Sequence, residues 1–183
     1  MEQMFLVKPS MDFAQEIVDF RQEFLEEGSA ICGAGPLENM TSIEDYLEKC
    51  KLYESWDSVP EGRVPGTQFL CVKKDPRGTS HEGMRLVGMI NARHCLNEAL
   101  LNYSGHIGYS VRKDERCKGY AKWMLSSCLN FYKTQLGIFR VLITCAPWNE
   151  ASRRTILSCG GVYEDTRYCE ARNENSERYW IEL

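Results

Sequence analysis

The chain has 183 residues, 43% of them apolar and 26% charged, which is typical of a folded domain and excludes a disordered or collagen-like chain. Its formal charge of −4 makes it a poor nucleic-acid binder, because phosphate affinity rests on an excess of Lys and Arg. No apolar run approaches the roughly 18 residues of a membrane span, and the start MEQMFLVKPS lacks the pattern of a signal peptide. We therefore expect a single cytoplasmic domain over residues 1–183.

The first third of the chain predicts one strand and two helices. Residues 4–9 form the expected strand. Apolar residues then recur at helical spacing up to Gly28, and they are Phe13, Ile17, Phe20 and Phe24. A loop over 28–40, rich in Gly and Pro, separates this helix from a second one that begins near Thr41.

From residue 68 the pattern changes to strands with helices among them. The expected strands are 68–72, 84–93, 105–111, 140–146, 162–172 and 178–183. A long helix over 119–136 follows the third of these, and a short helix capped by Asn149 follows the fourth. Segment 94–104 is a connection of undefined type. This order predicts an α+β domain with a mixed sheet, in which the unit from 105 to 146 is a right-handed parallel crossover.

Residues 108–125, GYSVRKDERCKGYAKWML, carry the most chemical information. A strand ends in a loop with four cations, which are Arg112, Lys113, Arg116 and Lys118. Gly119 then opens a helix, whose N-terminus presents free N–H groups and a partial positive charge. Together these features predict a phosphate site, whereas the simpler interpretation is a solvated, charged turn. The Walker pattern GxxxxGK[ST] and the dinucleotide pattern GxGxxG are both absent.

The loop resembles the acetyl-coenzyme A site of the GNAT superfamily of N-acetyltransferases. The family signature [RQ]xxGx[GA] occurs here as Arg116-Cys117-Lys118-Gly119-Tyr120-Ala121, after the strand GYSV and before a long amphipathic helix. The resemblance is most specific over 105–161 and extends to the element order of the whole chain. It implies a three-layer, mostly antiparallel sheet of about seven strands flanked by about four helices, with a splayed parallel pair at the CoA site.

The resemblance also implies roles for residues of this segment. The strand before the loop is expected to carry a bulge and to bind pantetheine through the backbone of Tyr109, Ser110 and Val111. The pyrophosphate is expected on the N–H groups of residues 116–121, with Arg116 closing over it. Asn149 matches the family Asn that binds the pantetheine arm, and it can cap a helix at the same time. No metal is expected.

The implied chemistry is direct attack of a neutral primary amine on acetyl-CoA in a ternary complex. A backbone N–H near Val111 would stabilise the oxyanion, while a base and an acid move protons. Many relatives carry an acidic Tyr seven residues after the Asn, but this chain has Ile156 there. The general acid is therefore unassigned, and another group or water would serve.

Three residues are candidates for the general base. His106 lies on the strand before the motif, but side-chain alternation puts it on the face opposite 107, 109 and 111 unless a bulge shifts the register. Glu98 and His94 lie in the preceding connection, near where an acceptor could enter. The competing interpretations are a hydrogen-bonded His under a helix and surface or capping roles for the other two.

The nine cysteines are scattered singly and include no CxxC pair. They predict buried free thiols in a reducing compartment, not a disulfide framework or a zinc site. Cys117 is the exception, because a helix N-terminus and two flanking cations favour its thiolate. We expect Cys117 to react fast with thiol reagents and CoA to protect it.

The acceptor is expected to be a small-molecule or peptide amine, with neither nucleic acid nor membrane as a partner. The resemblance places its pocket between loop 28–40 and the last hairpin. That hairpin mixes charges of both signs, which are Arg167, Arg172, Arg178, Glu170, Glu174 and Glu177. Neither a polyamine nor an acidic amino acid is favoured. A homodimer is common in such folds, but no sequence feature demands one.

Two rival hypotheses belong to other functional classes. A non-catalytic acyl-CoA sensor with the same fold would bind CoA tightly without amine-dependent turnover, and the missing Tyr supports it. An α+β interaction protein with an accidental loop match would not bind CoA at all.

Overall fold

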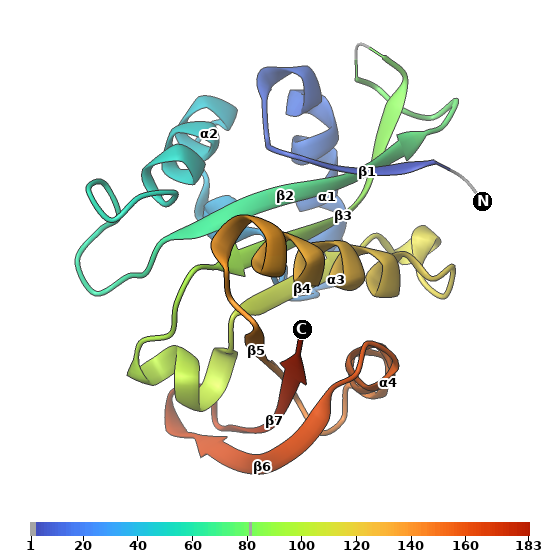
Figure 1. The fold of residues 1–183 in the computed structure, drawn as a ribbon. Helices are drawn as coiled ribbons and strands as arrows, with labels where there is room; N and C mark the ends of the chain where they lie inside the picture. Colours follow the sequence, from blue (N-terminus) through green and yellow to red (C-terminus); the bar gives the residue numbers. More distant parts are fainter. Residues whose placement is uncertain (1–2, 81) are drawn as a thin grey trace.

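The centre of the molecule is a sheet of seven strands in the order β1-β2-β3-β4-β5-β7-β6 (Figure 1). The computed structural model describes residues 3–80 and 82–183. The strands are β1 (Met4–Val7), β2 (Gly66–Lys74), β3 (Met84–Arg93), β4 (Ile107–Val111), β5 (Arg140–Cys145), β6 (Val162–Cys169) and β7 (Glu174–Glu182). All neighbouring strands are antiparallel except β4 and β5, which run parallel. The expected mixed, mostly antiparallel sheet is confirmed.

Helices cover both faces of this sheet, as the resemblance implied (Figure 1). The α-helices are α1 (Ala14–Glu27), α2 (Ile43–Leu52), α3 (Tyr120–Phe131) and α4 (Glu150–Ser158). One core packs α1 and α2 against the sheet and the other packs α3 and α4 against it. Strand β2 serves both cores, since Phe69 and Cys71 face α3 while Leu70 and Val72 face α1 and α2. None of the helices in the described part of the chain is long and apolar enough to cross a membrane.

Strands β4 and β5 are paired at one end and diverge toward the other. Their parallel ladder consists of the pair Ile107–Ile143. On its other edge β4 stays in continuous antiparallel register with β3 from Ile107 to Val111. The expected splayed pair is confirmed, but the register of β4 against β3 shows no bulge. The sheet therefore opens into a V between β4 and β5, with its closed end at Ile107.

The element order agrees with the sequence prediction except at two places. The undefined connection contains a helical segment over Leu100–Ser104. The final turn lies earlier than expected, because Glu170–Arg172 form a 3-10 turn and Asn173 takes a positive φ of 51°. The predicted polar turn over 173–177 therefore belongs largely to β7, where the buried Ser176 donates a hydrogen bond to the carbonyl of Tyr103.

Candidate functional site

The open edge of β4 faces the gap between β4 and β5. The N–H of Arg112 donates to the carbonyl of Val87 on β3. Because successive residues of a strand point their backbone groups to opposite edges, Val111 and Tyr109 direct theirs toward the gap. Ser110 points its carbonyl toward β3, close to Gly88. Of the three residues expected to pair through the backbone, Tyr109 and Val111 thus have the suitable orientation.

The loop after β4 presents backbone N–H groups at the start of α3. Cys117 and Gly119 both have positive φ, 62° and 86°, on either side of Lys118. Such alternation turns successive N–H groups into one concavity that suits an anion. Within the part of the chain that the structure describes, the N–H groups of Cys117, Lys118 and Gly119 meet no protein acceptor in the turns and caps. A Cβ added at Gly119 would meet nothing within 4 Å, so the space before the helix is open.

The cations of this loop point away from that concavity. Arg116 donates to the carbonyl of Val111 at 3.1 Å and to the carboxylate of Glu27 on α1 at 3.1 Å. Lys113 binds the same carboxylate at 3.0 Å. The side chain of Arg116 thus points to Glu27 of α1 and does not close over the loop. An anion at this predicted site would rely on the backbone, since two of the loop cations, Arg116 and Lys113, are already paired.

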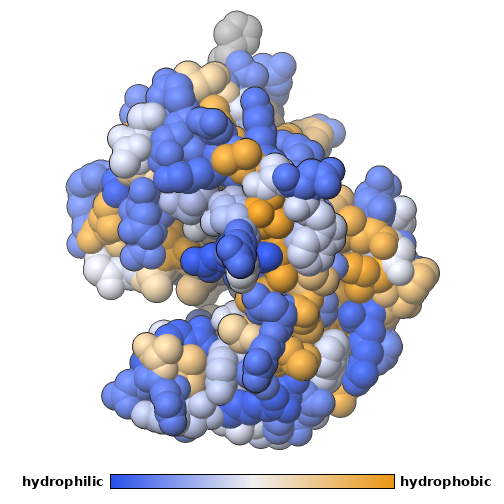
Figure 2. All heavy atoms as spheres, turned by 90° about the vertical axis from the view of Figure 1, so that its left-hand side faces the viewer, coloured by the Kyte–Doolittle hydropathy of each residue, from blue (hydrophilic) through white to orange (hydrophobic). Residues whose placement is uncertain are grey.

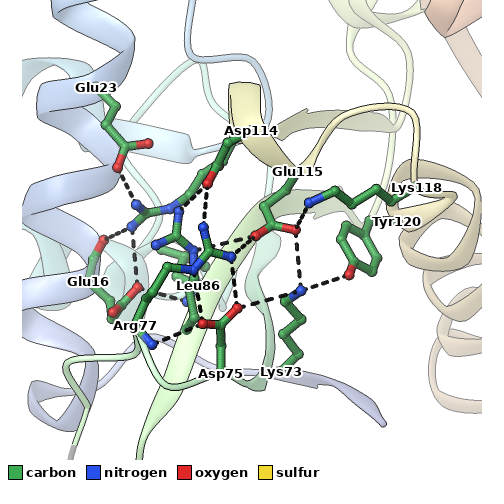
Figure 3. A network of polar contacts seen from close by, with 12 residues as sticks. Glu16, Glu23, Lys73, Asp75, Arg77, Leu86, Asp114, Glu115, Lys118 and Tyr120 are labelled. Carbon is green, nitrogen blue, oxygen red and sulfur yellow. Dashed lines mark hydrogen bonds and ion pairs between the residues drawn. The ribbon is translucent and has the colours of Figure 1, made fainter. Parts of the chain in front are cut away.

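The buried carboxylate of Glu115 anchors the loop from below. Four cations converge on it (Figure 3), and they are Lys118 at 2.9 Å, Arg77 at 2.7 Å, Lys73 at 3.3 Å and Arg85 at 3.6 Å. Burial acts to raise the pKa of Glu115, but the hydrogen bonds from Lys118 and Lys73 outweigh it and lower the pKa. Lys73 also donates to the hydroxyl of Tyr120 at 2.9 Å. The side chains of Lys118 and Tyr120 therefore stabilise the loop from inside. These two residues present their backbone, not their side chains, to the concavity.

A second buried carboxylate, Glu16 of α1, ties the end of β4 to the opposite layer. It accepts hydrogen bonds from the Leu86 N–H at 2.8 Å and from Arg112 at 3.2 Å. Arg112 also binds Glu23, so α1 neutralises the first cation of the loop (Figure 3). Sequence reasoning missed Glu16, Lys73 and the role of Glu115. No local pattern marks them, because their partners lie tens of residues away in the chain.

The three candidate bases lie at different places. His106 is buried at the closed end of the V, where its Nδ1 accepts the Leu142 N–H at 2.9 Å. Burial lowers its pKa to about 4. These contacts favour a structural role. His94 is half-buried beside the Thr67 hydroxyl at 2.9 Å, and burial lowers its pKa. Glu98 is exposed just before the segment Leu100–Ser104.

The comparison with protein families decides the identity of this arrangement. A model described as the acetyltransferase (GNAT) domain matches residues 34–162, more than half of the chain. The chain belongs to the GNAT acetyltransferase family. It is therefore an acyltransferase by family. A comparison with curated proteins found no match.

Solved GNAT structures share the fold at low sequence identity. RimJ from Mycobacterium smegmatis, solved with CoA-disulfide, has a TM-score of 0.70 at 16% identity, covering 98% of this chain and 82% of its own. The microcin C7 self-immunity acetyltransferase MccE, solved with acetyl-CoA and AMP, has a TM-score of 0.66 at 16% identity, covering 100% and 94%. The ribosomal-protein-S5-alanine acetyltransferase from Vibrio fischeri has a TM-score of 0.66 at 16% identity, covering 98% and 92%.

Two hydroxyl groups cross the gap where many GNAT proteins carry an acidic Tyr. Ile156, at that position, is fully buried in the core. Tyr109 instead reaches from β4 to α4, where its hydroxyl lies 3.0 Å from Oγ of Ser152. Burial raises the pKa of Tyr109 to about 12. Asn149 caps α4 by accepting the Ser152 N–H at 3.1 Å, which leaves its side-chain NH₂ to donate elsewhere.

The opposite face of β4 meets the loop between α1 and α2, where the resemblance to GNAT proteins placed the acceptor. Ser110 donates from its hydroxyl to the carbonyl of Cys32. Gly33 contacts Gly108 backbone to backbone, and a Cβ on Gly33 would lie 2.0 Å from the Gly108 carbonyl oxygen. Figure 2, which looks onto the left-hand side of Figure 1, shows a deep cleft with strongly hydrophilic side chains at its mouth.

Proposed function

We propose that this protein transfers the acetyl group of acetyl-CoA to a primary amine by direct attack in a ternary complex. The observation that carries the proposal is the continuity of two backbone surfaces. The edge of β4 at Tyr109 and Val111, where Arg116 holds the Val111 carbonyl, leads directly to the N–H groups of Cys117, Lys118 and Gly119 before α3. An extended pantetheine can pair with the first surface, and a pyrophosphate can bind the second.

Acetyl-CoA, when bound, supplies a thioester that an amine can attack. The N–H of Val111 faces the gap and is suited to stabilise the oxyanion. The NH₂ of Asn149 is suited to donate to the pantetheine arm. The geometry supports a backbone cradle for the pyrophosphate at residues 117–121, which assigns the side chains of Arg116, Lys118 and Tyr120 to loop architecture.

Proton transfer to the leaving thiolate is assigned to the pair Tyr109 and Ser152. Their hydroxyls share a hydrogen bond on the α4 side of the gap, next to Asn149. With a pKa of about 12, Tyr109 keeps its proton over the whole neutral range. For the base, Glu98 is the exposed candidate, and bulk water at the cleft is the alternative proton acceptor.

Calorimetry with acetyl-CoA tests the proposal, with Gly119→Glu as the disruptive variant. The added carboxylate would occupy the open space before α3 and repel the pyrophosphate. Gly137→Glu is the matched control, because Gly137 also has a positive φ, 64°, and open space around it, but lies after the C-terminal end of the same helical stretch. We expect micromolar binding to the native chain and to the control, and none to Gly119→Glu.

Mass spectrometry of amine mixtures then separates catalysis from sensing. Acetylated products that depend on acetyl-CoA and disappear in Gly119→Glu support the enzyme. Tight binding without product from any amine would support the sensor alternative. Failure of the folded native chain to bind acetyl-CoA would refute both.

A further inference from the structure

The arginines of this protein differ in what binds their guanidinium groups. Many of them pair with a carboxylate, and these are Arg77, Arg85, Arg112, Arg116, Arg140, Arg153, Arg154, Arg167 and Arg178. Arg93 instead donates from Nη1 to the carbonyls of Ser104 at 3.3 Å and Gly105 at 3.0 Å. Arg172 donates to the carbonyl of Tyr103 at 2.7 Å. Within residues 3–80 and 82–183, no ion pair joins Arg93 or Arg172 to a carboxylate.

Both of these arginines lie at the acceptor side of β4. The Nη2 atom of Arg93 would be 3.9 Å from a Cβ placed on Gly108, beside Gly33. Arg93 and Arg172 both act electrostatically on the thiol of Cys32, in the loop that covers β4. Two guanidinium groups from separate parts of the chain thus lie near the Cys32 loop, on the acceptor side of β4.

Charges of both signs act on the thiol of Cys32. Burial raises the pKa of Cys32, and among the charges around it Arg172 and Arg93 act more strongly than Glu38 and Glu174. Glu174 is also engaged, since it accepts the indole N–H of Trp148 at 2.6 Å. Of these two hairpin charges, Arg172 therefore has the larger effect on Cys32. Arg167 and Arg178 are neutralised by Asp165 on β6 instead.

Arg93 carries its charge in surroundings that disfavour it. Burial lowers its pKa, Tyr132 and Cys32 act in the opposite direction, and the cation Arg63 adds a smaller lowering. Two backbone carbonyls at Nη1 offset only part of the cost of desolvation. A guanidinium has five N–H donors in a planar fork that fits a carboxylate. An anion bound at Nη2 would supply the missing partner.

We propose that Arg93, assisted by Arg172, binds a carboxylate of the acceptor amine, an inference that rests on the proposed acetyl transfer. Gly108, beside Arg93, lies three residues before Val111, at the expected oxyanion site. Three residues of extended strand span about 10 Å. The acceptor amine and its carboxylate are therefore separated by several bonds. The two guanidinium groups would repel the additional ammonium groups of a polyamine, so polyamines are not the preferred substrates.

Matched pairs of amines test this substrate class. The small-molecule arm compares 4-aminobutanoate and 6-aminohexanoate with their carboxamides. The peptide arm compares Ala-Glu-amide with Ala-Gln-amide, which distinguishes a metabolite from a peptide as the source of the carboxylate. We expect kcat/KM for the preferred carboxylate to exceed that of its amide at least about tenfold, as suits a charge-assisted hydrogen bond.

The Arg93→Gln variant identifies the residue responsible. This variant should reduce the ratio of kcat/KM for the acid to kcat/KM for its amide to about one. Its affinity for acetyl-CoA should stay within about twofold of the native value, which also shows that the variant is folded. Arg140→Gln is the control, since Arg140 is exposed and pairs with Glu182 on the neighbouring strand. Equal rates for acids and amides, or a preference that survives Arg93→Gln, would overturn the inference and leave acetyl transfer intact.

A binding measurement keeps the inference testable without turnover. Calorimetry in the presence of CoA compares N-acetyl-6-aminohexanoate with its carboxamide. Tighter binding of the acid that requires Arg93 would support the carboxylate site even if no amine is acetylated, in which case only the proposed catalysis fails. Equal or absent binding of both ligands, together with no preference in turnover, would overturn the inference.

Discussion

The imidazole Nδ1 of His106 accepts a hydrogen bond from the Leu142 N–H at 2.9 Å, and the His106 N–H donates to the Leu142 carbonyl at 2.7 Å. A side chain thus completes the ladder between β4 and β5 at the closed end of their V. The ring packs edge-on against Tyr132 and Trp180. His106 fixes the point from which the two strands diverge.

We expect stability to fall at mildly acidic pH because of His106. Burial holds its pKa at about 4, below the ordinary 6.5, so the unfolded chain takes up the proton first. The contribution of the neutral His106 to the free energy of unfolding is complete above pH 6.5 and is lost between pH 6.5 and 4. It amounts to about 3 kcal/mol at most. Urea unfolding at pH 7.5, 5.5 and 4.5 measures it. In His106→Asn the amide oxygen can accept the same N–H without titrating, so its pH slope should be shallower. Parallel slopes would contradict this role.

We expect Ser152→Ala and Tyr109→Phe each to lower kcat by about tenfold, below the usual general-acid effect because a thiolate leaves easily. The double variant should lose little more than either single one, since the hydroxyls act as one hydrogen-bonded unit. Acetyl-CoA affinity should stay unchanged. Ser158→Ala is the control, as that hydroxyl bonds the carbonyl of Thr155 on its own helix. Fully additive losses, or unchanged kcat, would exclude the pair from proton transfer.

We expect Glu115→Gln to destabilise the fold by about 3 kcal/mol, because it removes the carboxylate on which Lys73, Arg77 and Lys118 converge. Acetyl-CoA affinity should fall as well, since the same carboxylate holds the loop in place. Asp114→Asn is the neighbouring control, with its carboxylate half-exposed and a loss of less than about 1 kcal/mol expected. Urea unfolding and calorimetry compare the variants. Equal losses at 114 and 115 would contradict the anchoring role.

We expect iodoacetamide to modify Cys117 faster than Cys32. Both residues are exposed, but the surroundings of the Cys32 thiol desolvate it and raise its pKa. Cys117 stands at the expected pyrophosphate site, so acetyl-CoA should slow its modification. Peptide mass spectrometry assigns the two rates. The protection should vanish in Gly119→Glu, which is predicted not to bind the ligand. The same rate with and without acetyl-CoA in the native chain would remove Cys117 from the site.

The element order and the motif loop were predictable because their signals are local. Gly119 and Gly137 occur where the helical pattern of α3 begins and ends, and both take positive φ there. Asn149 begins α4 as its side-chain chemistry predicts. Side-chain alternation did not determine the place of His106, whose ring accepts the Leu142 N–H of β5 and contacts both Tyr132 and Trp180. The bulge expected in β4 is absent from its register with β3.

The directions of the charged side chains were not predictable from local sequence. Arg116 and Lys118 can bind a phosphate as well as a carboxylate. Only folding brings the carboxylates of Glu27 and Glu115 next to them. The Tyr109–Ser152 pair likewise joins residues from separate elements. Sequence composition also could not show which arginines of the last hairpin pair with a carboxylate, since it counts charges without their partners.

The contact between Gly33 and Gly108 has a consequence for how this cleft can diversify. Backbone meets backbone there, and Gly33 also needs its positive φ of 72°, so any side chain at position 33 would push strand β4, which borders the proposed thioester site. Loop and strand are in direct backbone contact at this point. New acceptor preferences can therefore arise by exchange of side chains around the cleft, whereas insertions next to Gly33 would disturb β4 itself.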